Sequence, residues 1–342
     1  MKIEENVSLR EHSSMRLGGT ARFLTTVNSE EDLLSTLDFA KEKGVKFTVV
    51  GEGSNIVWTD DGYSGLVIVM KIEHLDAREE DGSFIFKVGA GNNWDDFVEE
   101  TVKKGLSGIE ALSLIPGSCG AAPVQNIGAY GQEASDTIEL IRALDTSTNE
   151  FIEIPNSDCG FGYRKSIFNS EQKGRYIITN VQFRLHKLNP QPPFYKDVDS
   201  YFESMDIISP SPSQLREAVI AIRSDKLPDP SRIPNNGSFF KNPIVSHQIA
   251  EKLKTNFPDI PAWELNENEV KLSAGWLVEN SGFNKGYEDS QTGMAIWKNQ
   301  ALVLVNKTAK SSADLFTFRD KIVDSVKSKF GLVLLQEPDI VI

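Results

Sequence analysis

Apolar positions along the first third of the chain switch between helix spacing and strand spacing. Residues 29–44 begin with Ser29 as a candidate N-cap, carry a regular apolar stripe and end at Gly44, which predicts a helix. The β-branched and aromatic run at 45–50 predicts a strand directly after it. A further strand is predicted at 84–89 and a second helix at 92–105. This order indicates a mixed α and β fold.

The second half of the chain shows the same mixture. Residues 176–186 end in alternating apolar and polar side chains, which predicts a strand with one buried face. Ser213 follows two Pro-rich breaks and is the expected cap of a short helix. A last helix is predicted from Ser312, and its apolar stripe consists of Leu315, Phe318, Ile322 and Val326.

Composition narrows the possible partners. The 342 residues carry a formal net charge of -13, which argues against nucleic acid and anionic membranes as partners. Any anion must therefore be bound by a few placed cations and peptide N–H groups. Two cysteines are too few for a disulfide framework, and we find neither a signal peptide nor a membrane-length apolar run. We expect a soluble, cytoplasmic protein.

Two glycine-containing segments are candidates for nucleotide chemistry. GEGSN at 51–55 joins two predicted strands, so its glycines can adopt positive φ and its N–H groups can converge on a phosphate. A tight β-turn explains the same residues equally well, and the third glycine of the dinucleotide fingerprint is missing. The longer run at 115–131 is rich in Gly and Ala, which allows close approach of a flat ligand such as a flavin. A buried crossover packed through its glycines is the alternative.

Three shorter segments carry cations or a serine among apolar residues. FGYRKSIF at 161–168 contains Arg164, GSFFKNP at 237–243 contains Ser238, and Arg223 and Lys226 lie three residues apart near a helix end. A buried arginine needs an anionic partner, whereas a surface arginine or a helix-dipole contact would need no ligand. Signatures of zinc enzymes, P-loops and nucleophile-elbow hydrolases are missing from the sequence.

Taken in order, GEGSN, IPGSCGAAPVQNIGAYG, FGYRKSIF, GSFFKNP and a terminal L-x-x-E ending at Glu337 resemble the UDP-N-acetylenolpyruvoylglucosamine reductases, bacterial flavoenzymes of peptidoglycan-precursor synthesis. The resemblance covers essentially the whole chain. It implies an α+β fold, in which a two-part FAD-binding unit of the vanillyl-alcohol-oxidase (PCMH) type is combined with a substrate-binding domain. The implied boundaries are 1–70, joined by 330–342, for the first FAD subdomain, 71–215 for the second and 216–329 for the substrate-binding domain.

The resemblance also implies the reaction. NADPH reduces FAD, flavin N5 delivers hydride to C3 of UDP-N-acetylglucosamine enolpyruvate, and Ser238 gives a proton to C2. Arg164 and a protonated Glu337 would stabilise the developing negative charge. Asp339 is a rival for the carboxylate role, because Pro338 and Asp339 replace the valine and arginine of many family members. The protein is expected to act as a monomer on this small-molecule substrate, without a metal.

The remaining contacts follow from the same resemblance. The FAD pyrophosphate would be bound by Gly51, Glu52, Gly53, Ser54 and Asn55. The flavin ring would be lined by Ile115, Pro116, Gly117, Gly120, Gln125, Asn126, Gly128, Ala129, Tyr130 and Gly131. The uridine and diphosphate of the substrate would be held by Tyr195, Arg223, Lys226, Asn242 and Gln300, with Tyr195 in the tyrosine loop of the longer family type.

Three alternatives remain open at this point. Another FAD-dependent oxidoreductase of the same fold would need the FAD motifs but neither GSFFKNP nor the terminal glutamate. A nucleotide-sugar binding or nucleotidyl-transfer protein would use the glycine loops for phosphates and show no flavin absorbance. A catalytically silent interaction protein would have no need of Arg164, Ser238 and Glu337 together.

Overall fold

The computed structural model describes residues 2–342, which form two compact units. Unit 1 consists of the residues up to Val7, Ala21–Glu52 and Ser64–Arg223. Unit 2 consists of Ser8–Thr20, Gly53–Tyr63 and Ser224–Ile342. The chain therefore enters each unit several times. The three-part division expected from the resemblance stays a prediction.

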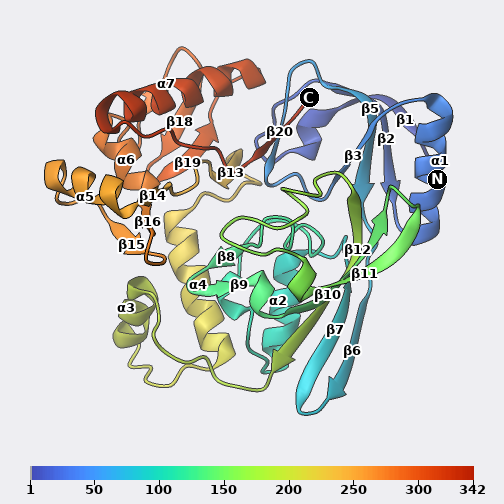
Figure 1. Ribbon diagram of the computed structural model, residues 1–342, viewed down its shortest axis with the longest axis horizontal. Coiled ribbons are helices and arrows are strands. Elements are labelled where there is room, and N and C mark those ends of the chain that lie inside the picture. The colour runs from blue at the N-terminus through green and yellow to red at the C-terminus, as the bar shows by residue number, and fades with distance from the viewer. Residues whose placement is uncertain (1) are drawn as a thin grey trace. The chain divides into compact units, whose positions relative to one another are not determined.

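A four-stranded sheet and a helix form the beginning of unit 1 (Figure 1). The strand order is β1 (Glu4–Ser8), β2 (Thr20–Val27), β5 (Tyr63–Met70), β3 (Phe47–Val50). Helix α1 (Glu30–Lys43) connects β2 to β3. The Ser29 side chain accepts the Asp32 N–H at 3.1 Å, and Gly44 ends the helix with φ +62°. Both predicted helix signals are confirmed.

A five-stranded antiparallel sheet forms the centre of unit 1. Its order is β11 (Glu150–Pro155), β10 (Ile138–Asp145), β12 (Tyr176–His186), β7 (Ser83–Gly89), β6 (Leu75–Glu80). The predicted alternation of β12 is confirmed, since Phe183 is fully buried and Arg184 is not. The Phe183 ring lies 5.0 Å from that of Phe97 and 5.8 Å from that of Trp94, so α2 (Trp94–Lys103) packs on this sheet.

Smaller elements complete unit 1. They are η2 (Glu110–Leu112), β8 (Gly128–Ala129), β9 (Gln132–Glu133), η3 (Ala134–Asp136), η4 (Asn156–Asp158), α3 (Lys196–Ser204) and α4 (Pro212–Lys226). The predicted cap of α4 is wrong by two residues, because the Ser211 hydroxyl accepts the Gln214 N–H at 3.3 Å and the Gln214 side chain accepts the Ser211 N–H at 2.9 Å. Proline suits the first helical position, so the helix begins at Pro212 and Ser213 lies inside it.

Unit 2 contains three small sheets and three helices (Figure 1). The sheets are β13 (Asn235–Ser238), β19 (Gln300–Asn306), β18 (Met294–Trp297), β17 (Glu288–Asp289); β14 (Ile244–Ser246), β16 (Glu269–Leu272), β15 (Ala262–Glu264); and the parallel pair β20 (Asp339–Val341), β4 (Ile56–Trp58). The other elements are η1 (Leu9–His12), α5 (His247–Asn256), α6 (Ala274–Asn280) and α7 (Ser312–Phe330). All four residues of the predicted α7 stripe are fully buried, which confirms that face. Over residues 2–342, no helix is both long and apolar enough to cross a membrane.

Candidate functional site

The two predicted flavin loops adjoin each other in unit 1. A Cβ on Gly51 would lie 2.6 Å from the Ser118 Oγ, so the first residue of GEGSN touches the segment 115–131. Glu52 accepts a hydrogen bond from the Asn93 side chain at 2.9 Å, at the beginning of α2. A single cofactor can contact GEGSN and the segment 115–131 only if the two loops lie side by side. The loops do so here, and their residues therefore fit FAD.

Gly53, which belongs to unit 2, has a packing role as well. Its φ is +69°, and a Cβ would lie 2.2 Å from the His12 carbonyl oxygen. The Ser54 carbonyl oxygen accepts hydrogen bonds from the Ser14 hydroxyl at 3.3 Å and from the Asn236 amide at 3.0 Å. The glycine predicted for phosphate approach is thus also required by the close approach of this loop to η1.

The beginning of the 115–131 segment is hydrogen-bonded to the residues around the first turn of α2. The Trp94 N–H donates to the Gly117 carbonyl at 2.9 Å, and the Gly120 N–H donates to the Ala90 carbonyl at 3.0 Å. A Cβ on Gly120 would lie 2.4 Å from that of Ala90. The segment is an ordered loop rather than a linker, as predicted, and Gly120 allows its close packing.

The end of this segment forms a tight hairpin. Gly128 and Ala129 pair with Glu133 and Gln132, and the central residues Tyr130 and Gly131 have φ values of +49° and +90°. Positive φ at both central residues is typical of a type I′ turn. The hairpin lies in unit 1, and the Tyr195 ring packs edge-on against Tyr130 with centroids 6.1 Å apart. Tyr195 itself is 55% exposed.

Asn126 holds this hairpin from within. Its amide nitrogen donates to the Glu133 carboxylate at 2.8 Å and to the Gly162 carbonyl at 3.3 Å, and its amide oxygen accepts the Ser135 N–H at 3.0 Å. The side chain is almost fully buried. Protein groups therefore use the amide that the resemblance assigns to FAD, and they give Asn126 a structural role that the sequence did not reveal.

Arg164 lies in a turn that faces the hairpin. Gly162 and Lys165 exchange backbone hydrogen bonds at 3.0 and 3.1 Å, and Arg164 between them has φ +53°. Its Nη2 donates to the Gly128 carbonyl at 2.9 Å. The guanidinium is thus hydrogen-bonded to the predicted flavin loop. Arg164 as a residue is half-buried, so it is neither the fully buried nor the surface arginine considered from the sequence.

Arg223 brings a second cation to the same part of unit 1. Its Nη2 donates to the Leu114 carbonyl at 3.2 Å, while its Nε is buried and has no hydrogen-bond partner within residues 2–342. Burial lowers the pKa of the Arg223 guanidinium, Tyr130 and Asp95 oppose this effect, and the Arg164 charge lowers the pKa further. The two guanidinium groups therefore repel each other, and an anion bound between them would relieve the repulsion.

Ser238 and Glu337 lie close together in the backbone of unit 2. Ser238 ends β13 opposite Val303, after a bulge that contains Gly237. The Glu337 N–H donates to the carbonyl of Phe239, the residue after Ser238, at 2.8 Å. Asn55 reaches the Glu337 carbonyl with its amide at 3.5 Å. Asp339 lies instead in β20 opposite Ile56 and is exposed, and the choice between Glu337 and Asp339 for the carboxylate role stays a prediction.

Two other predicted substrate residues meet at the beginning of α6. The Asn242 amide oxygen accepts the Ala274 N–H at 2.9 Å, and a Cβ on Gly275 would lie 3.7 Å from the Gln300 amide oxygen. Lys226 is the last residue of α4. The structure therefore groups Arg164, Arg223 and Tyr195 in unit 1, and Ser238, Glu337, Asn242 and Gln300 in unit 2.

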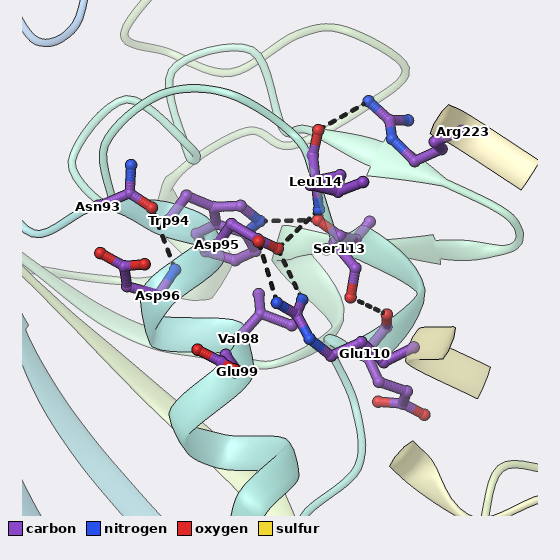
Figure 2. Close-up of polar contacts among 12 residues, drawn as sticks. Asn93, Trp94, Asp95, Asp96, Val98, Glu99, Glu110, Ser113, Leu114 and Arg223 are labelled. Carbon is purple, nitrogen blue, oxygen red and sulfur yellow. Dashed lines mark hydrogen bonds and ion pairs between the residues drawn. The ribbon is translucent and has the colours of Figure 1, made fainter. Parts of the chain in front are cut away.

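Sequence reasoning missed an ion pair beside Arg223. Arg216 forms a two-fold hydrogen bond with Asp95 at 2.6 and 3.0 Å, and Asp95 also accepts the Leu114 N–H at 2.6 Å. Figure 2 shows Asp95 and Leu114 at the first turn of α2, with Arg223 near Leu114. No local pattern announces them, because Asp95 and Arg216 are 121 residues apart in the sequence.

The comparisons with known proteins agree over the whole length of the chain. A model of the FAD binding domain matches residues 21–153, and a model of the C-terminal domain of UDP-N-acetylenolpyruvoylglucosamine reductase matches residues 229–341. The UDP-N-acetylenolpyruvoylglucosamine reductase of Cupriavidus pinatubonensis is 39% identical over 98% of both chains. That of Ralstonia nicotianae is 38% identical over 99% of both chains.

A solved structure supports the fold alone. The crystal structure of UDP-N-acetylenolpyruvylglucosamine reductase from Thermus caldophilus matches with a TM-score of 0.68 and 24% identity, over 99% of each chain. The α+β fold is therefore that of a crystallised protein, and the two structures match over nearly their whole chains.

Proposed function

The chain belongs to the UDP-N-acetylenolpyruvoylglucosamine reductase family, and we propose that it uses FAD to reduce UDP-N-acetylglucosamine enolpyruvate to UDP-N-acetylmuramate, a precursor of peptidoglycan. The structural observation that carries the proposal is the placing of Arg164 and Arg223 beside the predicted flavin loop, where they donate hydrogen bonds to the carbonyls of Gly128 and Leu114. The substrate has a carboxylate and a diphosphate, and two cations in an acidic protein suit such anions.

The residues of the chain have separate roles in this reaction. FAD, when bound and reduced by NADPH, supplies the hydride for C3 of the enolpyruvyl group. Arg164 stabilises the negative charge shared between C2 and the carboxylate, and Glu337 in its protonated form donates a hydrogen bond to that carboxylate. Ser238 transfers its hydroxyl proton to C2, since a neutral hydroxyl holds its proton at pH 7 and the carbanion-like centre is strongly basic.

Binding is shared among the other predicted residues. Arg223 and Lys226 hold the substrate diphosphate, while Tyr195, Asn242 and Gln300 contact the rest of the nucleotide. The loops containing Gly51 and Gly117 hold FAD. The chain works as a monomer in the cytoplasm, where NADPH and UDP-sugars are available, and binds neither nucleic acid nor membranes. The net charge of -13 supports the last point.

A variant of the proton donor tests the proposal. We expect Ser238→Ala to leave the bleaching of the flavin absorbance by NADPH nearly unchanged, while colour return on addition of UDP-N-acetylglucosamine enolpyruvate slows strongly. Stopped-flow absorbance under anaerobic conditions measures both steps. Equal loss of both steps would contradict the role of Ser238 as proton donor.

The wild-type protein provides the control for the activity itself. A flavin that bleaches with NADPH but does not regain its colour with the substrate would indicate another FAD-dependent oxidoreductase. A protein that binds UDP-sugar but takes up no FAD would indicate the nucleotide-sugar binder instead.

A further inference from the structure

The first turn of α2 is hydrogen-bonded to the segment 112–117 at several points, and Figure 2 shows the contact between Asp95 and Leu114. The Trp94 indole N–H donates to the Leu112 carbonyl at 3.0 Å, and the Trp94 backbone N–H donates to the Gly117 carbonyl at 2.9 Å. Between them, Asp95 accepts the Leu114 N–H at 2.6 Å. Two neighbouring residues of the helix thus determine the path of the chain into the predicted flavin loop.

Leu114 is held in an unfavourable conformation. Its φ is +56°, in the left-handed region that residues with a Cβ rarely adopt, and its side chain is 38% exposed. Polar contacts of its backbone stabilise this conformation, since the Asp95 carboxylate accepts the N–H and Arg223 donates to the carbonyl at 3.2 Å.

The Asp95 carboxylate is held in turn by Arg216. Their two hydrogen bonds measure 2.6 and 3.0 Å, and the side chains are only 25% and 11% exposed. Burial raises the pKa of Asp95, but the hydrogen bonds from Arg216 and Leu114 outweigh it and keep the pKa below its usual value. Arg216 and Arg223 are seven residues apart on α4, so they project from the same face of the helix.

We propose that the Asp95–Arg216 pair positions Arg223 for the substrate diphosphate by fixing the Leu114 peptide groups between α2 and α4. This inference rests on the proposed function. Asp95 and Arg216 are positioning residues and not catalytic residues, because both act on Arg223 through Leu114. Arg216 also neutralises the Asp95 carboxylate through two hydrogen bonds, which weakens the attraction of Asp95 for Arg223.

Three variants of the FAD-loaded full chain test the inference: Asp95→Ala, Arg216→Ala and the double variant. A loss of diphosphate binding raises KM and leaves kcat nearly unchanged, whereas general destabilisation lowers the active fraction and leaves KM alone. We expect each single variant to raise KM and the calorimetric Kd for UDP about tenfold, and the double variant to be no worse, as for two groups that act as one unit. Hydrogen exchange at the Leu114 amide, followed by mass spectrometry, should accelerate in all three.

Glu100→Gln is the matched control, since it removes an exposed ion pair with Lys104 on the same helix. It should leave KM, the Kd for UDP and the Leu114 exchange rate unchanged. Unchanged KM and Kd in Asp95→Ala, with a wild type that reduces the substrate normally, would overturn the inference alone. A wild type that neither binds UDP nor reduces the substrate would overturn the proposed function and the inference with it.

Discussion

Gly53 allows a quantitative test of why the loop GEGSN at 51–55 needs a glycine where it contacts His12. We compare Gly53→Ala with Gly331→Ala, because the two residues have nearly equal φ values of +69° and +72° in the same unit. A Cβ at position 53 would lie 2.2 Å from the His12 carbonyl oxygen, whereas a Cβ at position 331 would meet no atom within 4 Å. The difference between the variants therefore isolates the close contact.

The expected losses follow from two contributions. A Cβ in the left-handed region costs about 1–2 kcal/mol, which both variants share. Forcing an atom into filled space typically costs a further ~1–3 kcal/mol, which applies only to Gly53→Ala. The smaller unfolded-state gain of a Gly to Ala change is common to both and cancels. Gly53→Ala should therefore be less stable than Gly331→Ala by about 2 kcal/mol.

Urea unfolding of the FAD-free proteins measures the stability difference, and FAD titration measures binding. Equal destabilisation of the two variants would refute the argument from the His12 contact. If Gly53→Ala were as stable as Gly331→Ala but failed to bind FAD, the glycine would be needed for approach to the ligand rather than for packing.

Three further predictions concern stability and reactivity. Burial raises the pKa of Cys159 to about 12 and that of Cys119 well above its usual value, so neither thiol of the native protein should react with a thiol reagent at pH 8. Lys321→Met should lower the free energy of unfolding by about 1–3 kcal/mol at pH 7, because it removes the cation that donates to the buried Asp289 carboxylate at 2.6 Å and leaves it only backbone N–H donors. Ser211→Ala should cost about 1 kcal/mol through loss of the α4 cap.

Each of these has a contrary outcome. Fast reaction of either thiol before urea is added would show that the burial of the cysteines does not hold in solution.

Burial raises the pKa of Asp289, but the Lys321 and backbone hydrogen bonds lower it more. The contribution of the Asp289–Lys321 pair to stability is therefore present above pH 3.8 and is lost as the pH falls further. A gap between wild type and Lys321→Met that widened in acid would contradict this sign. Ser213→Ala should change the free energy of unfolding little. A loss of stability equal to that of Ser211→Ala would support Ser213 as the cap, as predicted from the sequence.

Elements with local signals were predictable from the sequence. The helix at 29–44 has a cap, a stripe and a glycine stop, and β12 alternates cleanly, so each matches its prediction. Strands without a buried face were missed. All but the last residue of β6 are exposed along Leu75–Glu80, which leaves no apolar alternation to detect. The α+β fold and the family implied by the resemblance are confirmed by the matched models and relatives.

The candidate site was predictable only in its motifs. The sequence indicated the residues of the glycine loops, Arg164 and Ser238, but not what holds them. The contact between Arg223 and Leu114 joins residues 109 positions apart, and the Asn126 amide is used by groups on two other segments. Such contacts depend on the Asp95–Arg216 ion pair that links α2 to α4 and on the hairpin at 128–133, which no local pattern specifies. The roles of the individual site residues stay predictions.

The pairing of β20 with β4 has a consequence for synthesis of the protein on the ribosome. Every residue assigned to unit 1 precedes position 224, so that unit can complete its sheets while later residues are still being translated. Unit 2 cannot complete its sheets at that stage, because β4 pairs with β20 at the end of the chain. The Phe239 carbonyl likewise accepts its hydrogen bond from the late residue Glu337. A chain that ended before position 337 would therefore keep the flavin loop at 115–131 but lack the β4–β20 pair, the hydrogen bond to Phe239 and the Glu337 carboxylate.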